Sequence, residues 1–145
     1  MSERSRSRLV RLRSADTIIV GGAILLFLDS FLEWQGDANA WGGDATFAGV
    51  LMALFALLVV ATGIIDALGM VMPAAIPLST VVTGLTVGAA VFGLIKFLFV
   101  VANHVRAGAW IGLALILVVS YGVYAKIRAE RIGRLPSGFT DRPPT

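Results

Sequence analysis

The chain has 145 residues, of which 57% are hydrophobic and only 14% charged, and its mean hydropathy is +0.86. Soluble domains are typically about 25% charged, so this composition indicates an integral membrane protein and leaves no segment for a soluble core. The absence of cysteine excludes disulfides, thiolate nucleophiles and cysteine metal sites, and a single histidine argues against a histidine metal centre. With no phosphate loop, nucleophile–base set or dinucleotide fingerprint either, we expect no metal, no cofactor and no enzymatic activity.

Residues 1–14 form a polar arm that carries five arginines between Arg4 and Arg13. Such an arm could bind nucleic acid, but it directly precedes an apolar segment. That position favours a cytoplasmic topology signal in contact with anionic lipid headgroups. We therefore expect no nucleic-acid partner.

Four apolar segments follow the arm within one predicted transmembrane domain, residues 15–127. The uninterrupted apolar part of the first segment, Thr17–Leu28, is short, so cleavage as a signal peptide at Ala38-Asn39-Ala40 is an alternative. The acidic and aromatic residues before that site suit a peptidase poorly. The break in the long run 47–101 falls at Gly69–Pro77, which holds one glycine and two prolines. The predicted spans are about 16–34, 47–68, 78–101 and 109–125, and the basic, proline-containing residues 128–145 form a cytoplasmic tail.

The distribution of positive charge predicts the orientation of these spans. Of the twelve Lys and Arg residues, five lie within Arg4–Arg13 and five within Lys126–Arg142, which leaves Lys96 inside a span and Arg106 in a loop. Two basic tails on one side require an even number of spans. By the positive-inside rule, the expected fold is all-α: a four-helix transmembrane bundle in the inner (plasma) membrane, with both termini cytoplasmic. Three tryptophans then fall at the outer interface: Trp34, Trp41 and Trp110.

Two charged residues inside predicted spans are candidates for a functional site, because an intramembrane charge is costly. Asp29 and Lys96 lie at similar depths below the outer ends of the first and third spans, so we predict that they form a buried ion pair. The alternative is that Lys96 extends alone toward the outer interface.

Two further acids are candidate coupling residues. Glu33 lies four residues after Asp29, on the same face of a continuous helix, and a solvated position in the headgroup layer is its simpler interpretation. Asp66 lies near the inner end of the second span. An interfacial anchor near Ser79, Thr80 or the basic tails is favoured there over a proton relay.

Small residues repeat every four positions in the third span, at Thr80, Gly84 and Gly88. This spacing permits close approach of another helix in lipid, either within the chain or from a second copy.

The segment Phe31-Leu-Glu-Trp34, with Asn39-Ala-Trp41 and an apolar helix after it, resembles a motif of small four-span membrane proteins of GC-rich bacteria that have no assigned function. Those proteins often have proline where this chain has Glu33. The resemblance covers roughly residues 18–60 and implies topology and envelope location only. Small multidrug resistance transporters share the four spans and an acid in the first span, and the likeness ends there.

Two functions are consistent with these features. The favoured hypothesis is a non-enzymatic accessory or scaffold subunit that packs against itself or a larger membrane complex. The alternative is a small ion- or proton-coupled transporter that uses Asp29, Glu33 and Lys96. A buried Asp29–Lys96 pair would hold both groups ionised, which disfavours the transporter.

Overall fold

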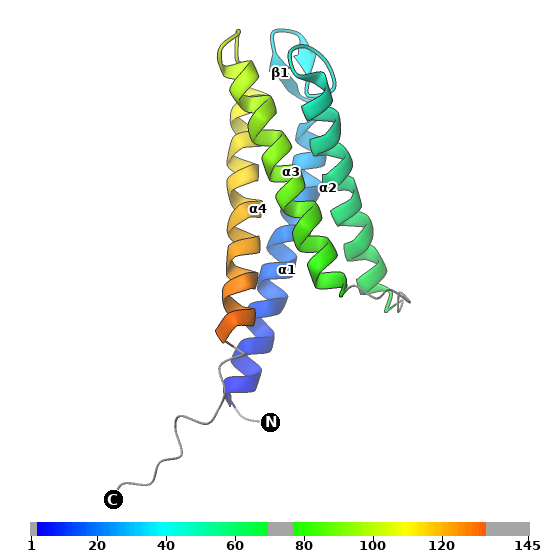
Figure 1. Ribbon diagram of the computed structural model, residues 1–145, viewed down its shortest axis with the longest axis vertical. Coiled ribbons are helices and arrows are strands. Elements are labelled where there is room, and N and C mark those ends of the chain that lie inside the picture. Colours follow the sequence, from blue (N-terminus) through cyan, green and yellow to red (C-terminus); the bar gives the residue numbers. More distant parts are fainter. Residues whose placement is uncertain (1–2, 70–76, 133–145) are drawn as a thin grey trace, which may run out of the picture.

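The structure is a computed structural model that describes residues 3–69 and 77–132 (Figure 1). It is mostly helical (78%), as the sequence predicts. Four helices make up most of the described chain, and two short strands follow the first helix. In chain order the elements are α1 (Glu3–Asp29), β1 (Glu33–Gln35), β2 (Ala38–Asn39), α2 (Thr46–Ala67), α3 (Leu78–Val101) and α4 (Ala107–Ile132).

Three helices of the described chain are long and apolar enough to cross a membrane: α2, α3 and residues Ala107–Arg131 of α4. This is consistent with a multi-pass membrane protein. The bounds of α2 and α3 agree within one residue with the predicted spans. Helix α4 continues past the predicted end of its span into the basic segment, since nothing in Lys126–Ile132 breaks a helix.

The first helix differs from its predicted extent at both ends. It begins at Glu3, so the basic arm and the apolar segment form one continuous helix rather than an arm followed by a span. It ends at Asp29, where a turn begins, and Glu33 already lies in β1. Asp29 and Glu33 therefore do not share a helical face, and that prediction is wrong because the helix ends at Asp29, before it reaches Glu33.

The helices pack as a closed ring in which each helix has two neighbours. Helix α1 lies along α4 and α2 lies along α3, while α3–α4 and α1–α2 contacts complete the ring. The interior is filled by apolar side chains that are at most 1% exposed: Ile19, Leu26, Met52, Val59, Val100 and Val119. The beginning of α1 and the end of α4 lie at the same end of the bundle (Figure 1). We call this the tail end.

The opposite end is closed by residues 30–45, which we call the cap. Strands β1 and β2 form an antiparallel hairpin in the cap, and the α3–α4 loop joins β1 through a bridge between Gln35 and Val105. Two backbone hydrogen bonds reinforce this junction: Gly36 N to His104 O at 3.2 Å and Arg106 N to Trp34 O at 3.0 Å. The connection between the first two predicted spans is therefore an ordered structure that is hydrogen-bonded to the α3–α4 loop.

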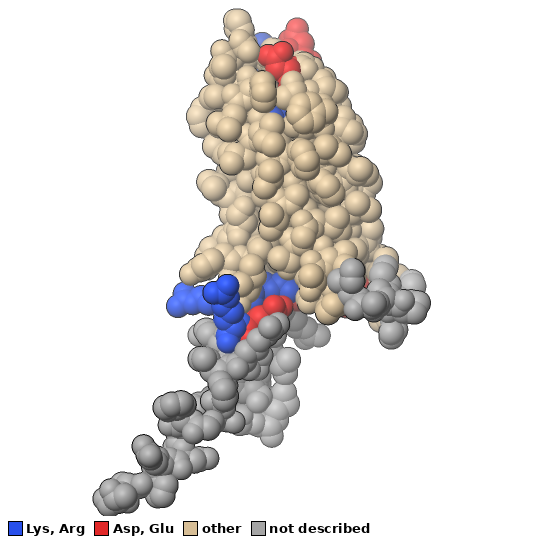
Figure 2. All heavy atoms as spheres, in the orientation of Figure 1, with Lys and Arg blue, Asp and Glu red and all other residues tan. Residues whose placement is uncertain are grey.

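Charge is confined to the two ends of the molecule on the face seen in Figure 2, where the body between them is drawn almost wholly as uncharged side chains. Many large apolar side chains lie exposed on this body, among them Leu25, Leu54, Leu98 and Leu117. An apolar surface of this extent would be unfavourable in water and is typical of a helix bundle surrounded by lipid.

Candidate functional site

The cap is held to the bundle by Lys96, the most deeply buried charged side chain in the described chain. Lys96 is 0% exposed, and its Nζ donates hydrogen bonds to the backbone carbonyl oxygens of Gly42 at 2.6 Å and Asp44 at 2.5 Å. Both acceptors belong to the cap, whereas Lys96 lies near the end of α3. A buried ammonium is stable only where hydrogen-bond acceptors replace water. Here cap carbonyls are those acceptors, so the lysine joins α3 to the α1–α2 connection.

A polar network beside Lys96 fixes the same part of the cap. The Asp44 carboxylate accepts hydrogen bonds from Gln35 Nε2 at 2.7 Å and from Asn103 Nδ2 at 2.9 Å. The Asp44 backbone N–H donates in return to Gln35 Oε1 at 2.8 Å. One carboxylate thus connects β1, the start of α2 and the α3–α4 loop.

Asp29 ends α1 beneath the cap and does not pair with Lys96. It is 3% exposed, and both of its carboxylate oxygens lack a hydrogen-bond partner within the described chain. The predicted ion pair is therefore wrong, because the lysine reaches toward carbonyls of the cap instead. Matched depth along two helices fixes the height of two side chains but not the direction in which each one points.

Gly112 on α4 makes room for Asp29. A Cβ atom at this position would lie 2.6 Å from Asp29 Oδ2 and 2.3 Å from the Trp34 ring. The Asp29 carboxylate and the Trp34 indole therefore share one space against the backbone of α4. The Trp34 Nε1 atom donates to the Asp29 backbone carbonyl at 3.2 Å, not to the carboxylate.

The three tryptophans occupy different environments. Trp34 is 0% exposed, so its predicted interfacial position is wrong: the indole fills the space between the cap and α4. Trp41 is half-buried, and its Nε1 donates to Ser30 Oγ at 3.0 Å. Trp110 is 54% exposed and packs edge-on against Phe97, with ring centroids 5.3 Å apart. Trp110 is thus the tryptophan that best suits an interfacial belt.

The small residues Thr80, Gly84 and Gly88, which repeat every four positions in α3, lie in two different environments. A Cβ atom at Gly88 would lie 3.1 Å from the Phe55 ring of α2, so Gly88 packs inside the bundle. Gly84 and Thr80 are exposed, and no atom lies within 4 Å of a Cβ built at Gly84. Closer approaches occur elsewhere, for example where a Cβ at Gly22 of α1 would lie 2.6 Å from Val119 of α4.

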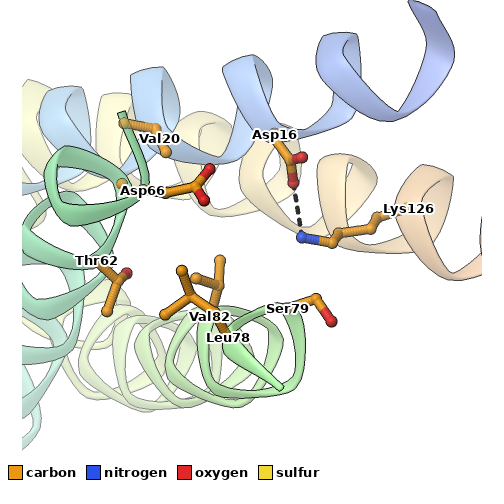
Figure 3. Close-up of a pocket in the computed structure, with 9 residues that line it drawn as sticks. Asp16, Val20, Thr62, Asp66, Leu78, Ser79, Val82 and Lys126 are labelled. Atoms are coloured by element: carbon orange, nitrogen blue, oxygen red, sulfur yellow. Dashed lines mark hydrogen bonds and ion pairs between the residues drawn. The ribbon is translucent and has the colours of Figure 1, made fainter. Parts of the chain in front are cut away.

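A cavity of about 200 Å³, lined by charged, hydroxyl and apolar side chains, opens among all four helices near the tail end (Figure 3). Asp16 and Lys126 form an ion pair across α1 and α4 at 2.7 Å, with Lys126 almost fully buried and Asp16 about half exposed. Asp66, from the last turn of α2, is exposed and directed into the same space (Figure 3). The α3 residues Ser79, which is partly exposed, and Val82, which is buried, also line the cavity. Asp66 and Ser79 thus line one cavity, and the anchoring role of Asp66 stays a prediction.

No protein-family model, curated protein or solved structure matches the chain. The geometry of these sites therefore carries the functional argument. Within residues 3–69 and 77–132, no group of three or more His, Asp or Glu side chains is arranged to hold a metal ion.

Sequence reasoning missed two features of these sites. The Asp16–Lys126 pair had a detectable signal, since each residue lies at the tail-end boundary of its apolar segment. The acceptors of Lys96 had no detectable signal in the sequence. Every residue has a backbone carbonyl, and only the fold decides which carbonyls face the lysine. Glu33, the other predicted coupling acid, is exposed in the cap, where β1 pairs it with Asn39.

Proposed function

We propose that this protein is a four-span integral membrane protein that acts as a non-enzymatic accessory or scaffold subunit. The fourth span is α1. Asp16 pairs with Lys126 near the tail end of α4, and Asp29 lies against Gly112 near its other end. The apolar part of α1 therefore runs alongside residues 112–126 of α4. These residues of α4 lie inside its candidate membrane span, Ala107–Arg131. The large side chains that α1 exposes between residues 18 and 29 are apolar: Ile24, Leu25 and Leu28.

The proposed orientation places the tail end in the cytoplasm and the cap outside. In the sequence, five arginines precede residue 14 and five basic residues follow residue 125, so basic residues flank the apolar segments of α1 and α4. Basic flanks of this kind are retained in the cytoplasm, where they contact anionic lipid headgroups. The positive charge and the resemblance of residues 18–60 to small four-span bacterial proteins both favour the inner (plasma) membrane.

The use of Lys96 is the observation that carries the scaffold role. An intramembrane charge is a functional candidate by default, yet both hydrogen bonds of this ammonium hold the cap in place. The most deeply buried charged side chain of the described bundle therefore has a structural role. A fixed cap at the outer end suits a protein that presents a stable surface, and the bare backbone at Gly84 offers a place where another helix can approach closely.

Site-specific photo-crosslinking tests this role in the full-length protein in its own membrane. A photoreactive residue at position 84 is expected to give an adduct with a second copy or another membrane protein. Position 117 on α4 is the control, because Leu117 is also exposed (63%) on the outside of the bundle. Equal adduct yields at the two positions, or none at either, would argue against a packing face on α3.

A coupled transporter remains a second candidate, favoured by one observation. Asp29 is a buried carboxylate without a hydrogen-bond partner in the described chain, which is the condition expected of a group that binds and releases a proton or cation. In this alternative Glu33 lies at the outer entrance, and Lys96 secures the cap. Purified protein in sealed vesicles would then show proton- or cation-driven flux that Asp29→Asn abolishes. A protein that folds but gives no flux would favour the scaffold.

A further inference from the structure

The cavity near the tail end has no role in the functions proposed above. Its walls come from all four helices and combine charged, hydroxyl and apolar side chains (Figure 3). Neither Asp29 nor Lys96 lines it. It is therefore a separate site.

The charges that face this cavity do not balance. Lys126 and Asp16 neutralise each other through their 2.7 Å ion pair. The Asp66 carboxylate is directed into the same space and makes no hydrogen bond or ion pair within the described chain (Figure 3). Among the described residues that line the cavity the formal charges sum to −1, which favours a cationic group that can donate hydrogen bonds.

The position of the cavity selects the kind of cation. Asp66 is the penultimate residue of α2, and Ser79 is the second residue of α3, so both lie at the boundary of their apolar helices. Val20 and Val82 form the cavity wall on the side of the bundle interior. A group that binds here has its polar part at the level of the lipid headgroups and apolar surface beside it.

We infer that this cavity binds the primary ammonium of an aminophospholipid headgroup, that of phosphatidylethanolamine. The ammonium donates to the Asp66 carboxylate. Lys126 uses one of its three donors on Asp16 Oδ1, so it retains donors for the phosphate of the same headgroup. An anionic headgroup without an ammonium is repelled by Asp66, and the quaternary ammonium of phosphatidylcholine has no N–H to donate. The inference rests on the membrane placement proposed above but not on the scaffold role.

Native mass spectrometry of the full-length protein tests the inference. Phosphatidylethanolamine, phosphatidylglycerol and phosphatidylcholine with the same acyl chains are titrated separately into the protein in detergent. We expect tight binding of the first lipid alone. Asp66→Asn should weaken it about tenfold, the effect of losing one charge-assisted hydrogen bond. The matched control is Asp37→Asn, which removes an exposed acid from the cap and should leave binding unchanged.

A second variant tests the cavity while Asp66 stays in place. Ser79→Phe should fill the cavity and abolish the preference for phosphatidylethanolamine. Equal binding of the three lipids, or unchanged binding by Asp66→Asn and Ser79→Phe, would overturn the inference. Soluble phosphoethanolamine, which has no acyl chains, distinguishes the source of the ammonium. Competition by this molecule at concentrations similar to those of the lipid would support the ammonium chemistry and overturn the assignment to a lipid.

Discussion

The Nζ atom of Lys96 lies 2.6 Å from the carbonyl oxygen of Gly42, in a contact that joins α3 to the cap. A second carbonyl, that of Asp44, accepts from the same ammonium. These hydrogen bonds connect parts of the chain more than fifty residues apart in sequence. Lys96 therefore determines where the α1–α2 connection rests on the bundle, and its removal should affect the whole outer end.

Lys96→Met is expected to lower the free energy of unfolding by about 1–3 kcal/mol, because it leaves two carbonyl oxygens without their donor. Thermal or chemical unfolding of the purified protein in detergent measures the change. Arg106→Met is the control: it removes an exposed cation near the same end and should change stability by no more than about 0.5 kcal/mol. Similar losses for the two variants would contradict the structural role of Lys96.

Asp29→Asn should not lower stability, because the Asp29 carboxylate has no hydrogen-bond partner to lose in the described chain. The double variant with Lys96→Met should show additive effects within about 0.5 kcal/mol. If the two residues formed an ion pair, Asp29→Asn alone would cost about 3–5 kcal/mol and the second substitution would recover part of that loss. A double-mutant cycle in detergent distinguishes these outcomes.

Gly49→Ala tests the contact between the cap and α2. A Cβ atom at position 49 would lie 1.7 Å from the backbone oxygen of Ala40, and backbone cannot rotate away as a side chain can. We expect a loss of at least about 1–3 kcal/mol from overpacking. Gly21→Ala is the matched substitution on α1, where no atom lies within 4 Å, and better helix propensity should make it neutral or stabilising. A Gly49→Ala protein as stable as Gly21→Ala would show that the cap does not rest on α2 as described.

The Asp16–Lys126 pair should contribute a coupling energy of roughly 0.5–1 kcal/mol, a small value because Asp16 is half exposed to solvent. A cycle of Asp16→Asn and Lys126→Met measures it, and added salt should reduce it. The absence of coupling at low ionic strength would mean that α1 and α4 are not joined at this point.

Much of the fold could be predicted because helix length and apolar composition are local properties. The bounds of α2 and α3 follow from uninterrupted apolar runs and from the break at Gly69–Pro77. The end of α1 at Asp29 could not be predicted from spacing, because the hairpin of the cap competes with the helix for residues 30–35.

The sites were harder to predict because they depend on side-chain direction across helices. Asp29 and Lys96 are both buried, yet each faces different neighbours. The sequence predicts Trp34 at an interface because tryptophan is typical there. In the fold, Gly112 of α4 has no side chain, and the Trp34 indole fills the space that this leaves. Such matches between a glycine on one helix and a large ring on another appear only in the assembled fold.

The central claim, that α1 crosses the membrane as a fourth span, is tested most directly by cysteine labelling in intact cells. The natural chain has no cysteine, so each single-cysteine variant reports one position. Asp37→Cys in the cap should react with an impermeant thiol reagent from outside, whereas Ser5→Cys and Arg128→Cys should react only after the membrane is opened. Labelling of both Ser5→Cys and Asp37→Cys from outside, with Arg128→Cys protected, would contradict the claim, because the chain would then cross the membrane three times.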